Sequence, residues 1–361
     1  MSRSLCITSA DGHTGFLIAE LCLTDPNFAN KLGSVTCLSL HPNADSCKEL
    51  TKLGAKIVSH KPGRLRDTVS TLKSIGADTM CLIPPAHQDK FNITVELIEA
   101  AKKANIPNVC FLSSAGCDLA ERDRQPRLRE FIDLEAMFMS SKGDPSTSTG
   151  HSPVIVRPGF YAENLLLYSK QAQEEGLLPL PIGTNHKFAP IALGDVAQVV
   201  AHVLTGEGKH GFSDKHRGQL IVLTGPMLAT GGELATAASK SIGEDLQFED
   251  ISEAEAKKVL HAQAESDESE IQYLLEYYSL VREGKTNYIS TTAFHDITGG
   301  HPQEPPDFFK VTWPVNKQII DILHKAICGW KGSGREEFLE LKGLISGQSG
   351  MVASVRLPLR R

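Results

Sequence analysis

The sequence lacks several features that would point to a particular compartment or partner. Its eight cysteines include no C-x-x-C pair, and no apolar run reaches 18 residues. The formal net charge is −6, so the chain lacks the excess of Lys and Arg that phosphate binding needs, and nucleic acid is not an expected partner. With no membrane span, no apolar leader and most cysteines in or beside apolar runs, we expect a cytoplasmic protein with reduced, buried thiols.

Motifs for metal binding and for nucleophilic catalysis are also missing. The 13 histidines show no H-x-x-x-H or H-E-x-x-H spacing, and there is no G-x-S-x-G elbow. His210 and His216 are separated by a polar loop, where solvated side chains are common. We therefore expect no metal site and no nucleophilic hydrolase chemistry.

The length and the patterning of the chain indicate its fold class. At 361 residues it exceeds the size, about 250–300 residues, at which a single core stops growing. The first half alternates short apolar runs with stretches of helical spacing, which is typical of β-α-β units. The expected strands are 5–8, 34–40, 56–58, 79–83, 108–112 and 151–158. The expected helices between them are 15–23, 44–53, 64–74, 91–104 and 130–140.

This pattern predicts an α/β protein with a Rossmann-type, doubly wound parallel sheet and a smaller C-terminal α/β lobe. We assign 1–158 to the dinucleotide-binding domain and 159–330 to the lobe, parts of which return to the sheet. Residues 331–361 form a basic tail. Within these units we expect a surface loop at 142–151, a helix at 266–283 and a Pro-rich turn at 302–309.

The first expected strand runs into the segment T-S-A-D-G-H-T-G at 8–15, directly before the first expected helix. Small residues at positions 9, 12 and 15 have the spacing of a dinucleotide-binding fingerprint, with serine in place of the first glycine. Backbone N–H groups at the helix start would then meet the pyrophosphate. A tight turn without a ligand is the alternative. The expected cofactor contacts here are Ser9, Asp11, Gly12, His13, Thr14 and Gly15.

The choice of cofactor depends on the end of the second strand, where an Asp or Glu would bind the ribose 2′-hydroxyl of NAD. The chain reads L-H-P-N at 40–43, without a carboxylate. His41 and Asn43 can donate hydrogen bonds to a 2′-phosphate, and Lys61 after the third strand is a possible cationic neighbour. These residues favour NADP(H), with a solvated His41 as the alternative.

Further candidates follow the later strands, whose carboxyl ends face the nicotinamide in this fold. The expected contacts with the cofactor's face are Pro84, Pro85, His87 and Ser113. Candidates for proton transfer are Ser114, Asp118 and Tyr161. Each has an alternative reading: a turn serine, a solvated loop carboxylate and a packed aromatic, respectively. The expected substrate contacts are Phe160, Tyr161 and Asn164.

Three segments of the second half resemble one family. They are R-P-G-F-Y-A-E-N at 157–164, F-A-P-I-A-L-G-D-V-A at 188–197 and I-S-E-A-E-A at 251–256. Together they resemble the NmrA-like branch of the atypical short-chain dehydrogenases, over roughly residues 4 to 315. The resemblance implies a Rossmann core with NAD(P) along the carboxyl ends of the strands. Members of the family are quinone, alkene or natural-product reductases, or redox-sensing regulators that bind NADP without turnover.

The chain departs from this family at one important position. Short-chain dehydrogenases commonly use a Tyr-x-x-x-Lys pair for proton transfer, and many NmrA-like proteins keep only the Lys, four residues before a Glu. Here the corresponding helix reads F-I-D-L-E at 131–135, so Phe131 stands at the Lys position. Plain ketone reduction is therefore not expected. An acceptor that needs little acid help, such as an iminium or an activated alkene, fits better.

These observations lead to one preferred function and one alternative. The preferred function is an NADP(H)-dependent oxidoreductase for a bulky apolar molecule in secondary metabolism, with a redox-coupled cyclisation as one variant. The alternative is a non-catalytic NADP(H) sensor, and the oligomeric state stays open. Aromatic residues are expected to wall the substrate pocket, unless they pack in the core; they are Phe160, Tyr161, Tyr277, Tyr278, Phe308 and Phe309.

Overall fold

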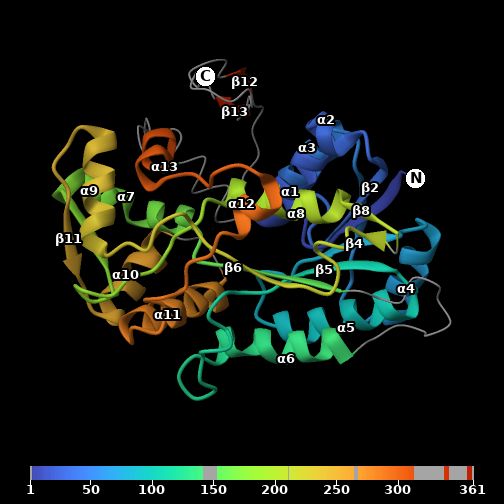
Figure 1. The fold of residues 1–361 in the computed structure, drawn as a ribbon, viewed down its shortest axis with the longest axis horizontal. Coiled ribbons are helices and arrows are strands. Elements are labelled where there is room, and N and C mark those ends of the chain that lie inside the picture. The colour runs from blue at the N-terminus through green and yellow to red at the C-terminus, as the bar shows by residue number, and fades with distance from the viewer. Residues whose placement is uncertain are drawn as a thin grey trace.

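A seven-stranded parallel sheet forms the centre of the protein (Figure 1). The computed structural model describes residues 2–140, 153–209, 211–263, 267–312, 337–340 and 356–359. The strands are β1 (Arg3–Ile7), β2 (Leu32–Ser39), β3 (Lys56–Ser59), β4 (Thr79–Leu82), β5 (Asn108–Leu112), β6 (Val154–Pro158) and β10 (Leu220–Leu223). Their spatial order is β10-β6-β5-β4-β1-β2-β3, so the chain winds outward in both directions from β1 and β4. This is the expected doubly wound α/β fold.

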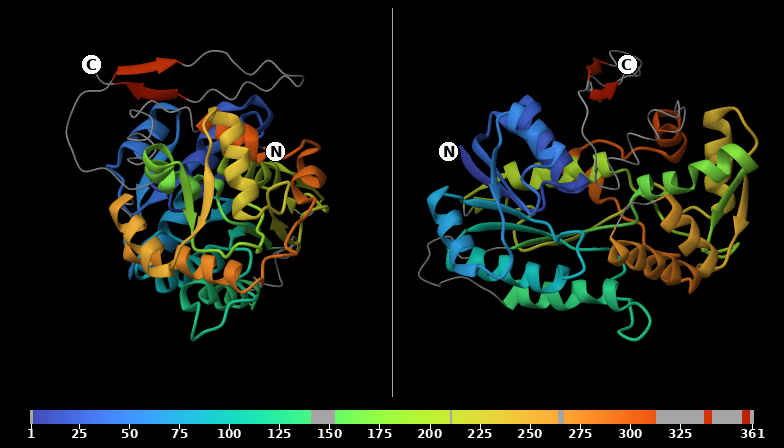
Figure 2. Two further views of the ribbon diagram at one scale, coloured as in Figure 1. Left: turned by 90° about the vertical axis from the view of Figure 1, so that its left-hand side faces the viewer. Right: turned by 180° about the vertical axis from the view of Figure 1, so that it is seen from behind.

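Helices cover both faces of the sheet, as the side view and the rear view show (Figure 2). One face carries α1 (His13–Thr24), α2 (Pro26–Ala29), α3 (Asp45–Lys52), α8 (Leu193–Thr205) and α12 (Ala293–Thr298). The other carries α4 (Leu65–Ser74), α5 (Lys90–Lys103) and α6 (Pro126–Ser140). Successive residues of β5 alternate between the two cores, since Phe111 packs with the α5 and α6 side and Cys110 with the α1 and α8 side.

A second group of elements, here called the C-terminal lobe, lies beyond the carboxyl ends of the strands (Figure 1). It consists of η1 (Ala162–Tyr168), α7 (Ser169–Glu175), β7 (Leu177–Leu180), α9 (Gly231–Ile242), β11 (Gln247–Asp250), α10 (Glu253–Gln263), α11 (Glu268–Arg282) and α13 (Pro305–Thr312). β7 and β11 form a small parallel sheet. Two antiparallel pairs stand apart, β8 (Glu207–Gly208) with β9 (Gly211–Phe212) and β12 (Glu337–Glu340) with β13 (Arg356–Leu359). The lobe brings α11 against α6 of the core.

Most expected elements are present, with shifts at their ends. α6 begins at Pro126 rather than at 130, and the expected Pro-rich turn at 302–309 gives way to α13, which begins at Pro305. Both corrections have one cause, because proline at a first helical position has its φ angle fixed for the helix and needs no N–H partner. The expected surface loop at 142–151 lies outside the described residues. Part of the expected tail forms β12 and β13.

The cysteines of the described part of the chain confirm the expectation of buried, unbridged thiols. Seven of them are free and buried, among them Cys6, Cys81 and Cys110 in the sheet. Burial raises the pKa of the Cys110 thiol to about 12, so it stays protonated. Over the same described ranges, no helix combines the length and apolar character needed to cross a membrane.

Candidate active site

The turn between β1 and α1 has the close packing that a dinucleotide-binding turn requires. Ser9 adopts a φ of +51°, the left-handed conformation in which glycine is usual, and its hydroxyl donates to the carbonyl of Ile83 at 2.8 Å. At Gly15, an added Cβ would lie 2.4 Å from the backbone oxygen of Ser9. Glycine is therefore required at position 15 so that α1 can pack against the end of β1.

Gly12 is different, because nothing in the chain itself requires a glycine there. An added Cβ would make only an ordinary contact, 3.5 Å from the oxygen of Ser9, and φ is −87°. The residue is exposed at the N-cap of α1, where free N–H groups can donate hydrogen bonds to an anion. Next to it, burial lowers the pKa of His13 to about 4, so its ring is neutral near pH 7. Gly12 thus leaves room for a group outside the chain.

The residues expected to choose the cofactor lie together at one edge of the sheet. β2 and β3 pair in register at Ser39 and Ser59, and His41 and Lys61 each follow two residues beyond that pair. His41 Nδ1 lies 2.9 Å from a carboxylate oxygen of Asp11, whose side chain is 14% exposed while that of His41 is 74% exposed. The imidazole is therefore exposed to solvent, and the less exposed carboxylate of Asp11 fixes its orientation. Asn43 is also exposed at this edge.

The ends of β1 and β4 are joined by a side chain. The hydroxyl of Thr8 donates to the carbonyl of Ile83 at 2.9 Å and accepts from the N–H of Ile83 at 2.7 Å. This places the following Pro84 and Pro85 beside the turn after β1. His87 is exposed farther along, and its Nδ1 accepts from the N–H of Asp89 at 2.9 Å.

Ser113 and Asp118 both contact a buried ion pair that joins β6 to α6. Arg157 of β6 donates from Nε and Nη2 to both oxygens of Glu135 in α6, at 2.8 and 2.7 Å, and Ser113 donates to the same carboxylate. Asp118 lies 3.1 Å from Nη1 of Arg157, with its side chain 52% exposed. Burial raises the pKa of the neighbouring Cys117 to about 12. These contacts fit a structural role for Ser113 and Asp118.

Ser114, in contrast, faces the C-terminal lobe. Its hydroxyl lies 2.8 Å from the phenol oxygen of Tyr273 in α11, a hydrogen bond between residues 159 positions apart. Ser114 is buried and Tyr273 is half-buried. Sequence spacing gave no sign of Tyr273, but one signal was present. That signal is the run of tyrosines on α11, where Tyr273 is followed by Tyr277 and Tyr278.

A buried lysine also went unrecognised in the sequence. Lys90, the first residue of α5, is 4% exposed, and its Nζ lies 4.3 Å from the centre of the Phe131 ring and 5.6 Å from that of Tyr273. Nζ also lies 3.7 Å from a carboxylate oxygen of Glu130. Position 131 has no lysine of its own, but Lys90 of the neighbouring helix α5 places its amino group beside the Phe131 ring.

The expected residues after β6 divide between site and core. Tyr161 hydrogen-bonds Thr14 at the start of α1, and burial raises the pKa of its phenol to about 12. Phe160 is 2% exposed and packs on three rings, which fits core packing; they are Phe188, Tyr277 and Tyr278. Asn164 lies in η1 and is half-buried. Phe308 and Phe309 are buried as well.

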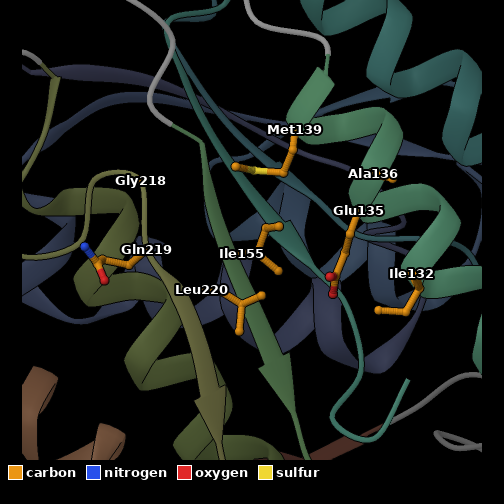
Figure 3. A pocket seen from close by; sticks show the side chains of 8 residues that line it. All are labelled: Ile132, Glu135, Ala136, Met139, Ile155, Gly218, Gln219 and Leu220. Carbon is orange, nitrogen blue, oxygen red and sulfur yellow. The ribbon is translucent and has the colours of Figure 1, made fainter. Parts of the chain in front are cut away.

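One hollow of about 300 Å³ lies away from these residues, between α6 and the amino-terminal ends of β6 and β10. Figure 3 shows its lining side chains, among them Met139 and Ile132 of α6 and Leu220 of β10. Cofactors of this fold bind at the carboxyl ends of the strands, so the hollow is not the expected cofactor site. Within the described ranges, no cluster of three or more His, Cys, Asp or Glu side chains is arranged for a metal ion.

Comparisons with known proteins fit this geometry. No protein-family model matches the chain. The NAD(P)H azoreductase of Xenophilus azovorans is 27% identical over 210 residues, which cover 58% of this chain and 67% of that protein. Prestalk A differentiation protein A of Dictyostelium discoideum is 29% identical over 217 residues, which cover 60% of this chain and 63% of that protein. The chain thus spans about two thirds of the length of these curated relatives.

A solved structure extends the likeness over most of the fold. The NADPH-dependent quinone oxidoreductase QOR2 of Escherichia coli, complexed with NADPH, matches with a TM-score of 0.69 and 20% identity. The match covers 85% of this chain and 99% of that chain. The comparison confirms the Rossmann-type α/β fold, while membership of the NmrA-like branch stays a prediction.

Proposed function

We propose that this protein binds NADP(H) and is a reductase that transfers hydride to a conjugated small molecule of the quinone or azo class. The observation that carries the proposal is the turn after β1, where Gly15 is required by packing and Gly12 is exposed and required by nothing in the chain. A glycine that the fold does not need, at a helix N-terminus, is suited to the close approach of a pyrophosphate.

The adenosine end of the proposed site favours a phosphorylated cofactor. The outward-facing ring of His41 and the ammonium of Lys61 follow neighbouring strands at equivalent positions. A 2′-phosphate is an acceptor for both groups, whereas an NAD-type site would present a carboxylate there. Asp11 does carry a carboxylate, but that carboxylate contacts Nδ1 of His41 and is much less exposed than the imidazole.

The acceptor class rests on the relatives. Their names describe reduction of azo compounds and of quinones, both of which are conjugated and electron-poor. Iminium ions and activated alkenes share that chemistry, and a secondary-metabolic substrate of this kind is the finer prediction. When bound, NADPH supplies the hydride, and the protein's own groups bind the acceptor and supply a proton.

Titration with four cofactors tests the proposal. Binding of NADPH, NADP, NADH and NAD is followed by fluorescence in the native protein and in His41→Asp. We expect native binding of the phosphorylated pair to be about 10-fold to 100-fold tighter, because a charge-assisted hydrogen bond contributes roughly 1.5–3 kcal/mol. His41→Asp should abolish that difference. NADPH oxidation is then measured with menadione, methyl red and an enone, and the absence of binding by every cofactor would refute the proposal.

A sensor that binds NADP(H) without turnover is the second candidate. One relative is named for differentiation and not for a reaction, and Phe131 replaces the lysine that NmrA-like reductases carry. A sensor would bind NADPH in the same titration but would oxidise it with none of the three acceptors.

A further inference from the structure

We propose that Tyr273, contributed by the C-terminal lobe, is the proton donor of the reaction, and that Ser114 positions its hydroxyl. This inference rests on the proposed reductase function. Tyr273 then does the work that the Tyr-x-x-x-Lys helix does in other dehydrogenases, but it reaches the site from α11 and not from α6.

The pairing of the two hydroxyls is the first support. Ser114 follows β5 directly, at the carboxyl edge of the sheet, and its Oγ lies 2.8 Å from the phenol oxygen of Tyr273. The serine is 1% exposed and is held by the core, whereas the tyrosine is half-buried. The buried serine therefore holds the phenol hydroxyl in a fixed position at the carboxyl edge of the sheet.

The second support is the connection to the cofactor turn. The side chains of Tyr161 and Thr14 meet in the first turn of α1. Burial raises the pKa of the Tyr273 phenol well above its ordinary value, and the nearby Tyr161 adds to that shift. The phenol of Tyr273 therefore belongs to a group of hydroxyls that extends from the lobe to the β1–α1 turn. In this fold the pyrophosphate of a dinucleotide lies at that turn, and its nicotinamide faces the carboxyl ends of the later strands, such as β5.

The third support is the way the ring of Tyr273 is held. Phe131 meets it edge-on, with the ring centres 6.1 Å apart, and Nζ of Lys90 lies over both rings. A lysine side chain at position 131 would occupy the space of that aromatic contact. Phe131 thus acts as part of the support for Tyr273, which accounts for the residue that departs from the family pattern.

Other hydroxyl and acidic groups near the site are already committed. Ser113 donates to Glu135, and Asp118 pairs with Arg157. Tyr277, one turn along α11, is 4% exposed and packs its ring against Phe160. The hydroxyl of Tyr273, in contrast, is held by another hydroxyl, that of Ser114.

Proton transfer from Tyr273 completes the reduction of a quinone. Hydride transfer adds two electrons and one hydrogen to the quinone, which becomes a hydroquinone monoanion. The O–H bond of Tyr273 breaks, a new O–H bond forms on the product oxygen, and the negative charge passes to the phenolate. Ser114 donates a hydrogen bond to that phenolate until a solvent proton restores the phenol.

The test compares Tyr273→Phe with Tyr277→Phe, which removes the buried phenol one turn away on the same helix. Single-turnover oxidation of NADPH by menadione should fall about 10²-fold to 10³-fold in Tyr273→Phe, because a general acid contributes roughly that much. It should change less than threefold in Tyr277→Phe. The residual rate of Tyr273→Phe should drop about tenfold per pH unit, since solvent protons then replace the phenol.

Two further readouts separate proton donation from a structural effect. The affinity for NADPH should be the same in all variants. 4-Nitrophenolate, a stand-in for the product anion, should bind Tyr273→Phe at least tenfold more weakly, measured by its absorbance in the presence of NADP. Ser114→Ala should slow the single turnover about tenfold, and Ser114→Thr should restore it, because threonine keeps the hydroxyl.

Each other outcome overturns the inference in a recognisable way. If native protein reduces menadione and Tyr273→Phe keeps a rate within threefold, another group donates the proton and the reductase function stands. Loss of NADPH binding or of thermal stability in Tyr273→Phe, in parallel with the rate, would make the residue structural. Native protein that binds NADPH but reduces no acceptor refutes the reductase and the donor together.

Discussion

Replacement of Glu135 by leucine should destabilise the protein strongly. Glu135 is 6% exposed, and its carboxylate accepts two hydrogen bonds from Arg157 and one from Ser113. Arg157 is itself 7% exposed. Removing the carboxylate leaves a buried guanidinium whose only remaining anionic neighbour among these groups is the half-exposed Asp118.

The magnitude follows from the burial of the pair. Breaking a buried ion pair by removing one partner costs about 3–5 kcal/mol. The entropy of unfolding is about 2.1 cal/mol/K per residue, or roughly 0.76 kcal/mol/K for a chain of 361 residues. Glu135→Leu should therefore lower the melting temperature by about 4–7 °C.

The melting temperatures of Glu135→Leu and of two further variants are measured by calorimetry. Glu135→Leu combined with Arg157→Met should regain at least half of the lost stability, because an apolar pair of similar volume replaces a buried ion pair at little cost. Asp118→Asn should cost less than about 1 kcal/mol, since that carboxylate is exposed. The reasoning fails if Glu135→Leu melts with the native protein, or if the double variant is less stable than the single one.

Further predictions concern the turn, a buried acid and the lysine position. Gly15→Ala should cost about 1–3 kcal/mol in urea unfolding, because its Cβ would lie 2.4 Å from a backbone oxygen, whereas Gly12→Ala should keep the native stability and bind NADPH more weakly. Burial raises the pKa of Glu163 to about 7 from 4.5, so between pH 4.5 and pH 7 the folded state holds a proton that the unfolded state has lost. The contribution of Glu163 to the free energy of unfolding therefore falls as the pH rises through this range. Glu163→Gln should remove that pH dependence from urea unfolding curves. Phe131→Lys should lower the melting temperature and should not raise activity, because Nζ of Lys90 already lies 4.3 Å from the ring centre.

The local elements of the first half could be predicted because their patterns are local. Strand β5 reads N-V-C-F-L and is buried throughout, and the glycine at 15 follows β1 at the spacing that packing requires. Strand β10 was harder, since L-I-V-L at 220–223 is an ordinary short apolar run. Only its pairing with β6 makes it the seventh strand of the central sheet, and such pairing across more than 60 residues leaves no local trace.

At the candidate site, the sequence predicted positions better than it predicted partners. Ser113 and Ser114 were both expected directly after β5, but the two hydroxyls meet different partners. Ser113 turns with Phe111 toward α6 and meets Glu135, whereas Ser114 turns toward the lobe. The sequence places both serines, but it does not identify the group that each one meets.

The residues that the sequence did not reveal are those for which burial and residue type disagree. A lysine is rarely buried unless it is paired, and Lys90 is 4% exposed because Glu130 and two aromatic rings surround its ammonium group. A half-buried tyrosine such as Tyr273 must place its hydroxyl with a partner or in water. Both side chains converge on Phe131, the residue that broke the family pattern. Phe131 therefore connects α5 and α6 to α11, and the contacts around the proposed proton donor come from helices far apart in the sequence.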